Sequence, residues 1–239
     1  MSKGQLVLIP SALSANKPRQ YLPERSLEWI FDLTHFIAER SKTARQFLKS
    51  LDFPKPMSEI HVVELHKHQE EDYNELLQPC IEGINVGLLS EAGVPGVADP
   101  GGGVVRAAHD LGIDVVPLIG PSSLLLALMA SGMNGQKFTF HGYLPKDDKS
   151  LHKALTQMEG ESRRENTTHM FIETPFRNQK LHATLLKVLS SDTRLSVSVE
   201  LTSNNEVNRS KSIQEWKKIK INLDKKPTVF LIYSGEKVK

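Results

Sequence analysis

Short apolar runs recur along the chain, each about as long as a β-strand and rich in Val, Ile, Leu or Phe. Runs of this kind, bounded by polar residues or by Gly and Pro, are typical of strands buried in a sheet. They predict strands over residues 6–9, 86–89, 115–119, 138–143, 170–173, 195–201 and 229–233.

Between most of these runs, apolar residues recur every three or four positions, which is the spacing of one helix face. One such helix is expected to stop at Gly112, because glycine is favoured just after a helix. The residues that define the predicted helices are Leu27, Ile30, Phe31, Phe36 and Ile37; Leu76, Leu77 and Ile81; Val104, Val105, Ala108 and Leu111; the run 124–130; and Leu181, Leu185, Leu186 and Leu189.

Strands that alternate with helices predict an α/β fold with largely parallel sheets and helices on their faces. Residues 195–201 differ, because apolar and polar positions alternate there. That alternation predicts a half-buried strand near an edge or in an antiparallel part of a sheet. The polar segment 146–168 is expected to be a surface excursion with one weak helix.

A Gly-Pro turn inside the segment 117–123 separates a finished strand from an apolar helix. Ser122 is well placed to cap that helix at its N-terminus. We therefore expect two α/β domains, residues 1–117 and residues 121–239.

The composition is ordinary for a globular protein and narrows the function only in part. The 30 basic residues nearly balance the 28 acidic ones, so charge alone does not indicate a nucleic-acid partner. The single cysteine, Cys80, leaves no intrachain disulfide and no cysteine-rich zinc site, and we expect it to be a small buried hydrophobe. No apolar run approaches the roughly 20 residues of a membrane span, so we expect a soluble, cytoplasmic protein with no membrane partner.

Several familiar sites can be excluded by their motifs. The glycines before Arg106 do not form GxGxxG, and neither a P-loop nor a GxSxG elbow occurs. A group of histidines and glutamates does not have the spacing of a zinc motif, so no metal site is predicted. That group is His61, Glu64, His66, His68, Glu70 and Glu71. The basic clusters Arg163-Arg164 and Lys217-Lys218-Ile219-Lys220 are more typical of solvated surface than of binding sites, although together they are compatible with RNA contact.

Three segments place Gly, Pro or small hydroxyl residues where a strand ends and a helix begins. They are LSEAGVPGVADPG at 89–101, IGPSSLLLALMASG at 119–132 and FIETPFR at 171–177. In the third, Thr174 is expected to cap a helix whose first turn contains Pro175. Such loops predict a cleft between the domains for a small polar ligand; the alternative is three ordinary strand-to-helix turns.

These segments, together with FTFHGYLP at 138–145, resemble the tetrapyrrole methylase-like methyltransferases. The most similar branch contains bacterial small-subunit ribosomal RNA ribose 2′-O-methyltransferases, whose members carry SDAGTPxxSDPG, PLPGPSA, GFLP and FYESPHR motifs in this order. The segments VELT at 199–202 and PTVFLIYSG at 227–235 are similar to the RELTK motif and the closing strand of that branch.

The resemblance implies two α/β domains with S-adenosylmethionine in the cleft between them, a homodimer, and RNA or the small ribosomal subunit as substrate. A methyl group on a sulfonium is already activated, so transfer depends mostly on alignment, although a ribose hydroxyl benefits from a general base. The implied cofactor contacts are Pro10, Ser90, Glu91, Ala92, Gly93, Val94, Asp99, Pro100, Pro121, Ser122, Ser123, Leu144, Thr174, Pro175, Leu201 and Thr228.

Glutamates near the expected cleft are candidates for the general base. We expect Glu39 and Glu91 to be catalytic, ahead of Asp99, Glu173 and Glu200, because Glu39 matches the Glu of the branch's AEDTR motif and Glu91 lies in the cofactor loop. The resemblance places Lys42 and Arg45 on the substrate side.

The chain departs from the branch in its first 60 residues. Arg40-Ser41-Lys42 replaces Asp-Thr-Arg, and Arg and Lys are not equivalent where phosphate is bound in a bidentate manner. Two alternatives follow: methylation of a small molecule such as a tetrapyrrole, or a protein that binds the cofactor without catalysis. The first is disfavoured because tetrapyrrole enzymes carry a GDP-type loop where this chain has Glu91-Ala92-Gly93.

Overall fold

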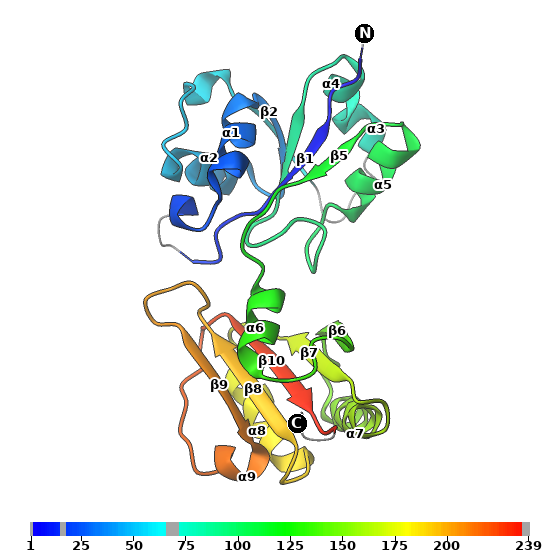
Figure 1. The fold of residues 1–239 in the computed structure, drawn as a ribbon, viewed down its shortest axis with the longest axis vertical. Helices are drawn as coiled ribbons and strands as arrows, with labels where there is room; N and C mark the ends of the chain where they lie inside the picture. Colours follow the sequence, from blue (N-terminus) through cyan, green and yellow to red (C-terminus); the bar gives the residue numbers. More distant parts are fainter. Residues whose placement is uncertain (1, 15–17, 66–71, 236–239) are drawn as a thin grey trace. The chain divides into compact units, whose positions relative to one another are not determined.

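The computed structural model describes residues 2–14, 18–65 and 72–235. The chain divides into two compact units, Met1–Ser122 and Ser123–Lys239. Each unit contains one five-stranded sheet (Figure 1). Both are α/β structures, as the sequence predicts. Within the described residues, no helix combines the length and the apolar character that a membrane crossing requires.

The sheet of the first unit has the strand order β3-β2-β4-β1-β5, and every pair in it is parallel. All its carboxyl ends therefore lie at one edge of the sheet, which is where open α/β sheets usually bind ligands. The strands are β1 (Leu6–Ile9), β2 (His35–Ala38), β3 (His61–Glu64), β4 (Val86–Leu89) and β5 (Val115–Pro117).

Helices cover both faces of this sheet (Figure 1). Ile9, Ile30 and Leu48 belong to the apolar cluster on the α1 and α2 side, and Leu88 and Val104 belong to the cluster on the α5 side. The helical elements are η1 (Pro18–Gln20), α1 (Glu24–Asp32), α2 (Ser41–Ser50), η2 (Met57–Glu59), α3 (Tyr73–Leu76), α4 (Gln78–Ile81) and α5 (Gly102–Asp110).

The sheet of the second unit has the order β6-β7-β10-β8-β9, and only its β6–β7 pair is parallel. The expectation of largely parallel sheets is therefore wrong for this unit. The short connection between β8 and β9 accounts for part of the difference, because parallel neighbours need a long crossover. The strands are β6 (Phe138–Tyr143), β7 (Thr168–Ile172), β8 (Arg194–Val199), β9 (Val207–Ser212) and β10 (Thr228–Tyr233).

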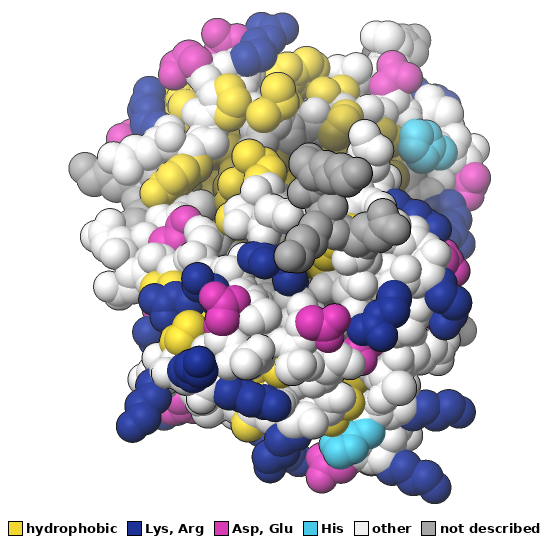
Figure 2. All heavy atoms as spheres, turned by 60° about the horizontal axis from the view of Figure 1, so that its bottom comes forward, with side chains coloured by type: hydrophobic (Ala, Val, Ile, Leu, Met, Phe, Trp, Pro, Cys, Tyr) yellow, Lys and Arg dark blue, Asp and Glu magenta, His cyan; other side chains and the backbone are white. Residues whose placement is uncertain are grey.

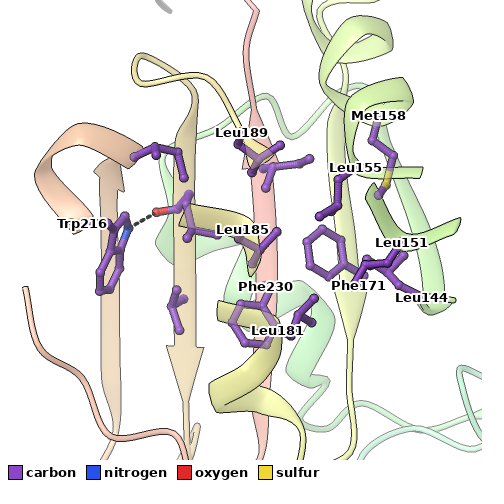
Figure 3. Close-up of a cluster of buried hydrophobic side chains, with 14 of the residues drawn as sticks. Leu144, Leu151, Leu155, Met158, Phe171, Leu181, Leu185, Leu189, Trp216 and Phe230 are labelled. Carbon is purple, nitrogen blue, oxygen red and sulfur yellow. Dashed lines mark hydrogen bonds between the residues drawn. The ribbon is translucent and has the colours of Figure 1, made fainter. Parts of the chain in front are cut away.

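The main core of the second unit lies between this sheet and three helices, α7 (Asp148–Glu165), α8 (Asn178–Val188) and α9 (Ile213–Trp216). Phe171 and Phe230 stack at its centre, with ring centroids 5.9 Å apart (Figure 3). The other face of the sheet is covered by α6 (Ser123–Ser131), which contacts β8, β9 and β10.

Strand β8 is buried on both faces, which corrects the prediction of a half-buried strand. Leu195, Val197 and Val199 face the main core, and the intervening Ser196 and Ser198 are also buried. The polar positions are covered because α6 packs on that face. The prediction of an antiparallel environment is confirmed, since β8 pairs antiparallel with both neighbours.

Two predicted helical regions differ from the structure. Phe36 and Ile37 lie on strand β2 rather than on the helix that contains Leu27 and Ile30, because α1 ends before them. The segment 146–168 is not a surface excursion with a weak helix, since α7 runs through most of it and buries Leu151, Leu155 and Met158.

Three smaller expectations can also be compared with the structure. Helix α5 ends before Gly112, whose φ of +62° is the left-handed conformation expected just after a helix. Cys80 is buried as predicted, and burial raises the pKa of its thiol to about 11. Thr174 is not a helix cap, because α8 begins at Asn178 after a turn in which the Arg177 amide donates to the Thr174 carbonyl.

Candidate functional site

The predicted residues of the first unit gather at the carboxyl edge of its sheet. Ile9 of β1 and Ala38 of β2 both pair with Leu89 of β4, so the residues that follow these three strands are neighbours. They are Pro10 and Ser11 after β1, Glu39 after β2, and Ser90 and Glu91 after β4.

Hydrogen bonds join the loop after β1 to the loop after β4. The Ser11 amide donates to the Gly93 carbonyl at 2.7 Å, and the Gly93 amide donates back at 3.2 Å, which forms an isolated antiparallel bridge. The buried Ser11 hydroxyl donates to the Ser90 carbonyl at 2.8 Å. Two loops far apart in sequence therefore form one backbone surface, and Ser11 is the residue that connects them.

Loop 90–101 has a backbone that ordinary residues would adopt only with strain. Gly93 has a φ of +76°, and a Cβ atom there would lie 3.3 Å from the Leu13 side chain. Ala98 also lies in the left-handed region, with a φ of +63°. Glycine at position 93 therefore permits both the turn and the close approach of the two loops. The other predicted contacts in this loop range from exposed (Ala92) to half-buried (Val94, Asp99 and Pro100).

The two glutamates predicted to be catalytic lie together. The Glu91 amide donates to Oε1 of Glu39 at 3.4 Å, so the Glu39 carboxylate contacts the start of the loop. Glu39 is only 7% exposed, whereas Glu91 is exposed and its Oε1 accepts a hydrogen bond from the Thr43 hydroxyl at 2.6 Å. Glu91 is therefore the more accessible of the two to a substrate.

Helix α2 begins beside these glutamates and carries the residues predicted to contact substrate. Its first amide, that of Ser41, donates to the Glu64 carboxylate at the end of β3 at 2.6 Å. Lys42 is exposed. Arg45 donates instead to two backbone carbonyls, those of Met57 at 2.6 Å and Ile60 at 2.9 Å, so its guanidinium fastens the η2 segment to α2.

A pocket of about 420 Å³ opens next to this cluster, within the size range of small-molecule sites. It is lined by Ser11, Ala12, Ser14, Pro18, Thr43, Ala44, Gln46, Phe47, Ser50, Leu89, Ser90 and Glu91. Sequence reasoning missed Ser11 and Thr43. The available signal for Ser11 is its position directly after the end of a buried strand, where ligand-binding residues of α/β proteins concentrate.

The predicted residues of the second unit gather at one end of its own sheet. Ile172 at the end of β7 pairs with Tyr143 of β6 and with Val229 of β10, and Thr228 pairs with Val199 at the end of β8. Leu144, Leu201 and Thr228 are buried there, Pro175 is half-buried and Thr174 is exposed.

Two further glutamates at this end of the sheet form ion pairs. Glu173 lies 3.2 Å from the Arg177 guanidinium and accepts from the Thr174 amide at 2.7 Å. Glu200 lies 3.2 Å from Nζ of Lys226. Because each carboxylate is engaged by a cation of its own unit, both help to hold the connections that follow β7 and β8.

The remaining predicted residues lie at the border of the units or in the histidine group. Pro121 and Ser122 are half-buried at the end of the first unit, and the half-buried Ser123 begins α6. His66, His68, Glu70 and Glu71 lie outside the described residues. Among the residues that are described, no three His, Cys, Asp or Glu side chains are grouped as metal ligands.

A family model for tetrapyrrole (corrin/porphyrin) methylases matches residues 19–216. The chain therefore belongs to the tetrapyrrole methylase family. Two solved structures share its fold: the methyltransferase CobJ, with a TM-score of 0.62 and 16% identity over 96% of this chain and 94% of that one; and uroporphyrin-III-C-methyltransferase from Thermus thermophilus, with a TM-score of 0.57 and 17% identity over 97% and 95%.

Curated relatives carry a more particular name. The chain is 33% identical over 182 residues to the ribosomal RNA small subunit methyltransferase I of Xylella fastidiosa, which covers 76% of this chain and 63% of the relative. The protein of the same name from Pseudomonas aeruginosa is 32% identical over 215 residues, 90% of this chain and 72% of the relative. The chain thus spans less than two thirds of the Xylella fastidiosa protein.

Proposed function

We propose that this protein is an S-adenosylmethionine-dependent methyltransferase that acts on ribosomal RNA of the small ribosomal subunit, at a ribose 2′-hydroxyl. Family membership and the names of the relatives support the reaction and the substrate class. The observation that carries the proposal is the bridge between Ser11 and Gly93, which brings two strand-end loops together beside a pocket.

The residues of the first unit fit a cofactor of this size and polarity. Ala92 carries only a methyl group and Gly93 carries no side chain, so a ligand can approach the amides and carbonyls of this turn closely. When bound, S-adenosylmethionine supplies an activated methyl group. We assign its binding to Pro10, Ser90, Glu91, Ala92, Gly93, Val94, Asp99, Pro100, Pro121, Ser122, Ser123, Leu144, Thr174, Pro175, Leu201 and Thr228.

Glu91 is the group that we assign to accept the proton of the ribose hydroxyl. Its carboxylate is exposed at the pocket and is oriented by the Thr43 hydroxyl at 2.6 Å. Glu39 then acts as a positioning residue, because its buried carboxylate accepts from the Glu91 amide. A carboxylate held in this manner can act as a general base when the substrate hydroxyl reaches hydrogen-bond distance.

The resemblance further implies a homodimer that works in the cytoplasm on RNA or on the assembled small subunit, with Lys42 on the substrate side. We propose these features together with the activity. The exposed Lys42 supports its part of the proposal, and the engagement of Arg45 by two backbone carbonyls favours a structural role for that residue. Light scattering of the purified protein tests the dimer directly.

The test of the function is transfer of labelled methyl from S-adenosylmethionine to fractions of a strain that lacks the gene. The fractions are small ribosomal subunits, naked total RNA, soluble protein and small-molecule extract. We expect label in the subunit or RNA fraction, in a form that makes one ribose resistant to alkali. Label in the small-molecule extract would instead support tetrapyrrole-type chemistry, and cofactor binding without any transfer would support a binding protein.

Variants of Glu91 test the assignment of the general base. At saturating S-adenosylmethionine, Glu91→Gln should lower the transfer rate by about 10²- to 10⁴-fold, the usual contribution of a positioned base. Glu82→Gln is the matched control, because Glu82 is an exposed carboxylate of the same unit that also accepts one side-chain hydrogen bond, from Gln78 at 3.1 Å. Normal turnover in Glu91→Gln would refute this role.

A further inference from the structure

The two units differ in the sign of their charge, although the whole chain is nearly neutral. Residues 1–122 contain 11 Lys and Arg against 16 Asp and Glu, a formal charge of −5. Residues 123–239 contain 19 Lys and Arg against 12 Asp and Glu, a formal charge of +7. The second unit should therefore attract a polyanion, whereas the first should repel it.

Part of this excess is concentrated along one edge of the second sheet. Strand β9 forms this edge, opposite the edge formed by β6, and the short helix α9 follows β9 directly. We call the exposed cations of this segment the basic strip: Arg209, Lys211, Lys217, Lys218 and Lys220. Figure 2 shows lysine and arginine side chains spread over one face of the molecule, with acidic side chains between them.

The register of the sheet places two members of the strip on the same side. Arg209 pairs with Val197 and Lys211 with Leu195, and directly paired residues of antiparallel strands point to the same face. Val197 and Leu195 belong to the core that α8 and α9 cover. Arg209 and Lys211 therefore project beside α9, and Lys217 and Lys218 follow that helix.

The backbone that carries the basic strip is firmly anchored. The Trp216 side chain is fully buried, and its indole N–H donates to the Leu195 carbonyl at 2.7 Å (Figure 3). Ser212 and Glu215 form a capping box at the start of α9. Ile219 packs against the core between Lys218 and Lys220. The cations are thus presented by an ordered segment rather than by a free tail.

Most of the strip is not neutralised by the protein itself. Lys211 lies 3.3 Å from Oε1 of Glu215. Within the described part of the chain, no acidic side chain lies within ion-pair distance of Arg209, Lys217, Lys218 or Lys220. A row of cations without ion-pair partners can bind a row of phosphates, and contacts of this kind do not read the base sequence.

We propose that the basic strip binds the phosphate backbone of RNA and thereby holds the substrate on the second unit, independently of base sequence. This inference rests on the proposed function, which makes RNA the partner. Each phosphate that a Lys or Arg contacts releases counterions, so the strip should make RNA affinity depend steeply on salt.

The test compares two triple variants of the full-length protein. Lys217→Gln/Lys218→Gln/Lys220→Gln removes three cations of the strip. Lys149→Gln/Lys153→Gln/Arg164→Gln removes three exposed cations from α7, which packs against β7 and β10 rather than β9. Binding of a fluorescent 20-nucleotide poly(U) is followed by anisotropy between 50 and 200 mM KCl, and S-adenosylmethionine affinity and methyl transfer are measured separately.

The strip variant should bind poly(U) up to about 100-fold more weakly at 100 mM salt, and its log–log salt slope should fall by about 2, since three phosphate contacts on a single strand are lost. The α7 variant should keep most of its affinity, and both should bind S-adenosylmethionine normally. Equal losses in the two variants, no loss in the strip variant, or no poly(U) binding by the unmodified protein would overturn the proposal.

Two outcomes separate this inference from the proposed function. Poly(U) binding that depends on the strip, without methyl transfer to any fraction, would support the role of the strip and refute the proposed function. Methyl transfer to RNA, together with poly(U) binding that the strip variant does not weaken, would support the proposed function and refute the role of the strip. If polyglutamate bound the strip as tightly as poly(U), the partner would be an acidic protein and the assignment to RNA would be wrong.

Discussion

Replacing Ser11 by Ala tests whether the bridge between the two strand-end loops holds the cofactor site in its binding shape. Ser11 is 4% exposed, and its hydroxyl donates to the Ser90 carbonyl at 2.8 Å. The substitution removes one oxygen atom and leaves the buried Ser90 carbonyl without that donor. The backbone bonds between Ser11 and Gly93 do not involve the hydroxyl and can still form.

The expected magnitude follows from the cost of leaving a buried acceptor unpaired, about 1–2 kcal/mol of unfolding free energy. For a unit of roughly 100 residues, each kcal/mol lowers the midpoint of thermal unfolding by about 4–8 °C. If, in the Ser11→Ala variant, the ligand must order the loop that Ser11 orders in the original protein, the binding free energy becomes less favourable by the same amount. The Kd of S-adenosylmethionine should then rise by about 5- to 30-fold.

Ser162→Ala provides a matched control. The Ser162 hydroxyl is fully buried and makes one backbone hydrogen bond of the same length, accepting from the Ser234 amide at 2.8 Å. It lies on α7, in the second unit, away from the predicted cofactor contacts. We expect a comparable loss of stability with an unchanged Kd.

Calorimetric titration of S-adenosylmethionine and a thermal unfolding scan measure both quantities for each variant. A Ser11→Ala protein that is less stable but binds the cofactor with the original Kd would refute the reasoning that this hydroxyl shapes the site. An equal increase in Kd in Ser162→Ala would show that the loss of affinity follows global stability instead.

Three further predictions concern packing and pH. Arg45→Gln should lower the unfolding free energy by about 2–3 kcal/mol, because two backbone carbonyls lose a charged donor, whereas the exposed Lys42→Gln should change it by less than about 0.5 kcal/mol; urea unfolding measures both. Trp216→Phe should cost about 2–4 kcal/mol in the same assay, since the fully buried indole loses its 2.7 Å hydrogen bond to β8 and part of its volume. Burial lowers the pKa of His169 and His182 below the ordinary value of 6.5, so below that pH the unfolded chain binds protons that the folded chain does not. Stability should therefore be flat between about pH 7 and 8 and fall between pH 6.5 and 5.5, by at most about 1.4 kcal/mol per pH unit for each histidine; a rise over that interval would contradict the assignment.

Three of the predicted strands have the same bounds as strands in the structure. The runs 6–9, 86–89 and 138–143 coincide with β1, β4 and β6. For β1 and β4 the reason is physical, because a strand in the middle of a parallel sheet is covered by helices on both sides and reads as a continuous apolar run.

The elements that were missed carry a weaker or a misleading pattern. Strand β2 is short and begins only a few residues after α1, so its Phe36 and Ile37 merge with the helical spacing of Leu27 and Ile30. Strand β9 reads VNRSKS, which lacks an apolar period because it is an edge strand with one neighbour. In each case, pairing and packing within the sheet determine that the segment is a strand, and the local sequence pattern does not reveal it.

The same limit applies to the site. That Glu39 and Glu91 lie together could be anticipated, since Glu39 directly follows β2, Glu91 is the second residue after β4, and parallel strands end at one edge. The bonds from Ser11 to Ser90 and from Thr43 to Glu91 span 79 and 48 residues. Pairings over such separations depend on the tertiary fold and leave no periodic signal in the chain.

The strand orders have a consequence for synthesis of the protein. Strand β1 lies between β4 and β5, so Leu6–Ile9 has no partner until residues 86–89 have left the ribosome. At typical translation rates this interval is roughly 4 to 16 seconds. The second sheet has the same property at its other end, because β10 lies between β7 and β8. The central pairings of the first sheet thus wait for β4 and those of the second sheet wait for β10, and until then an apolar strand remains open to chaperones or to other nascent chains.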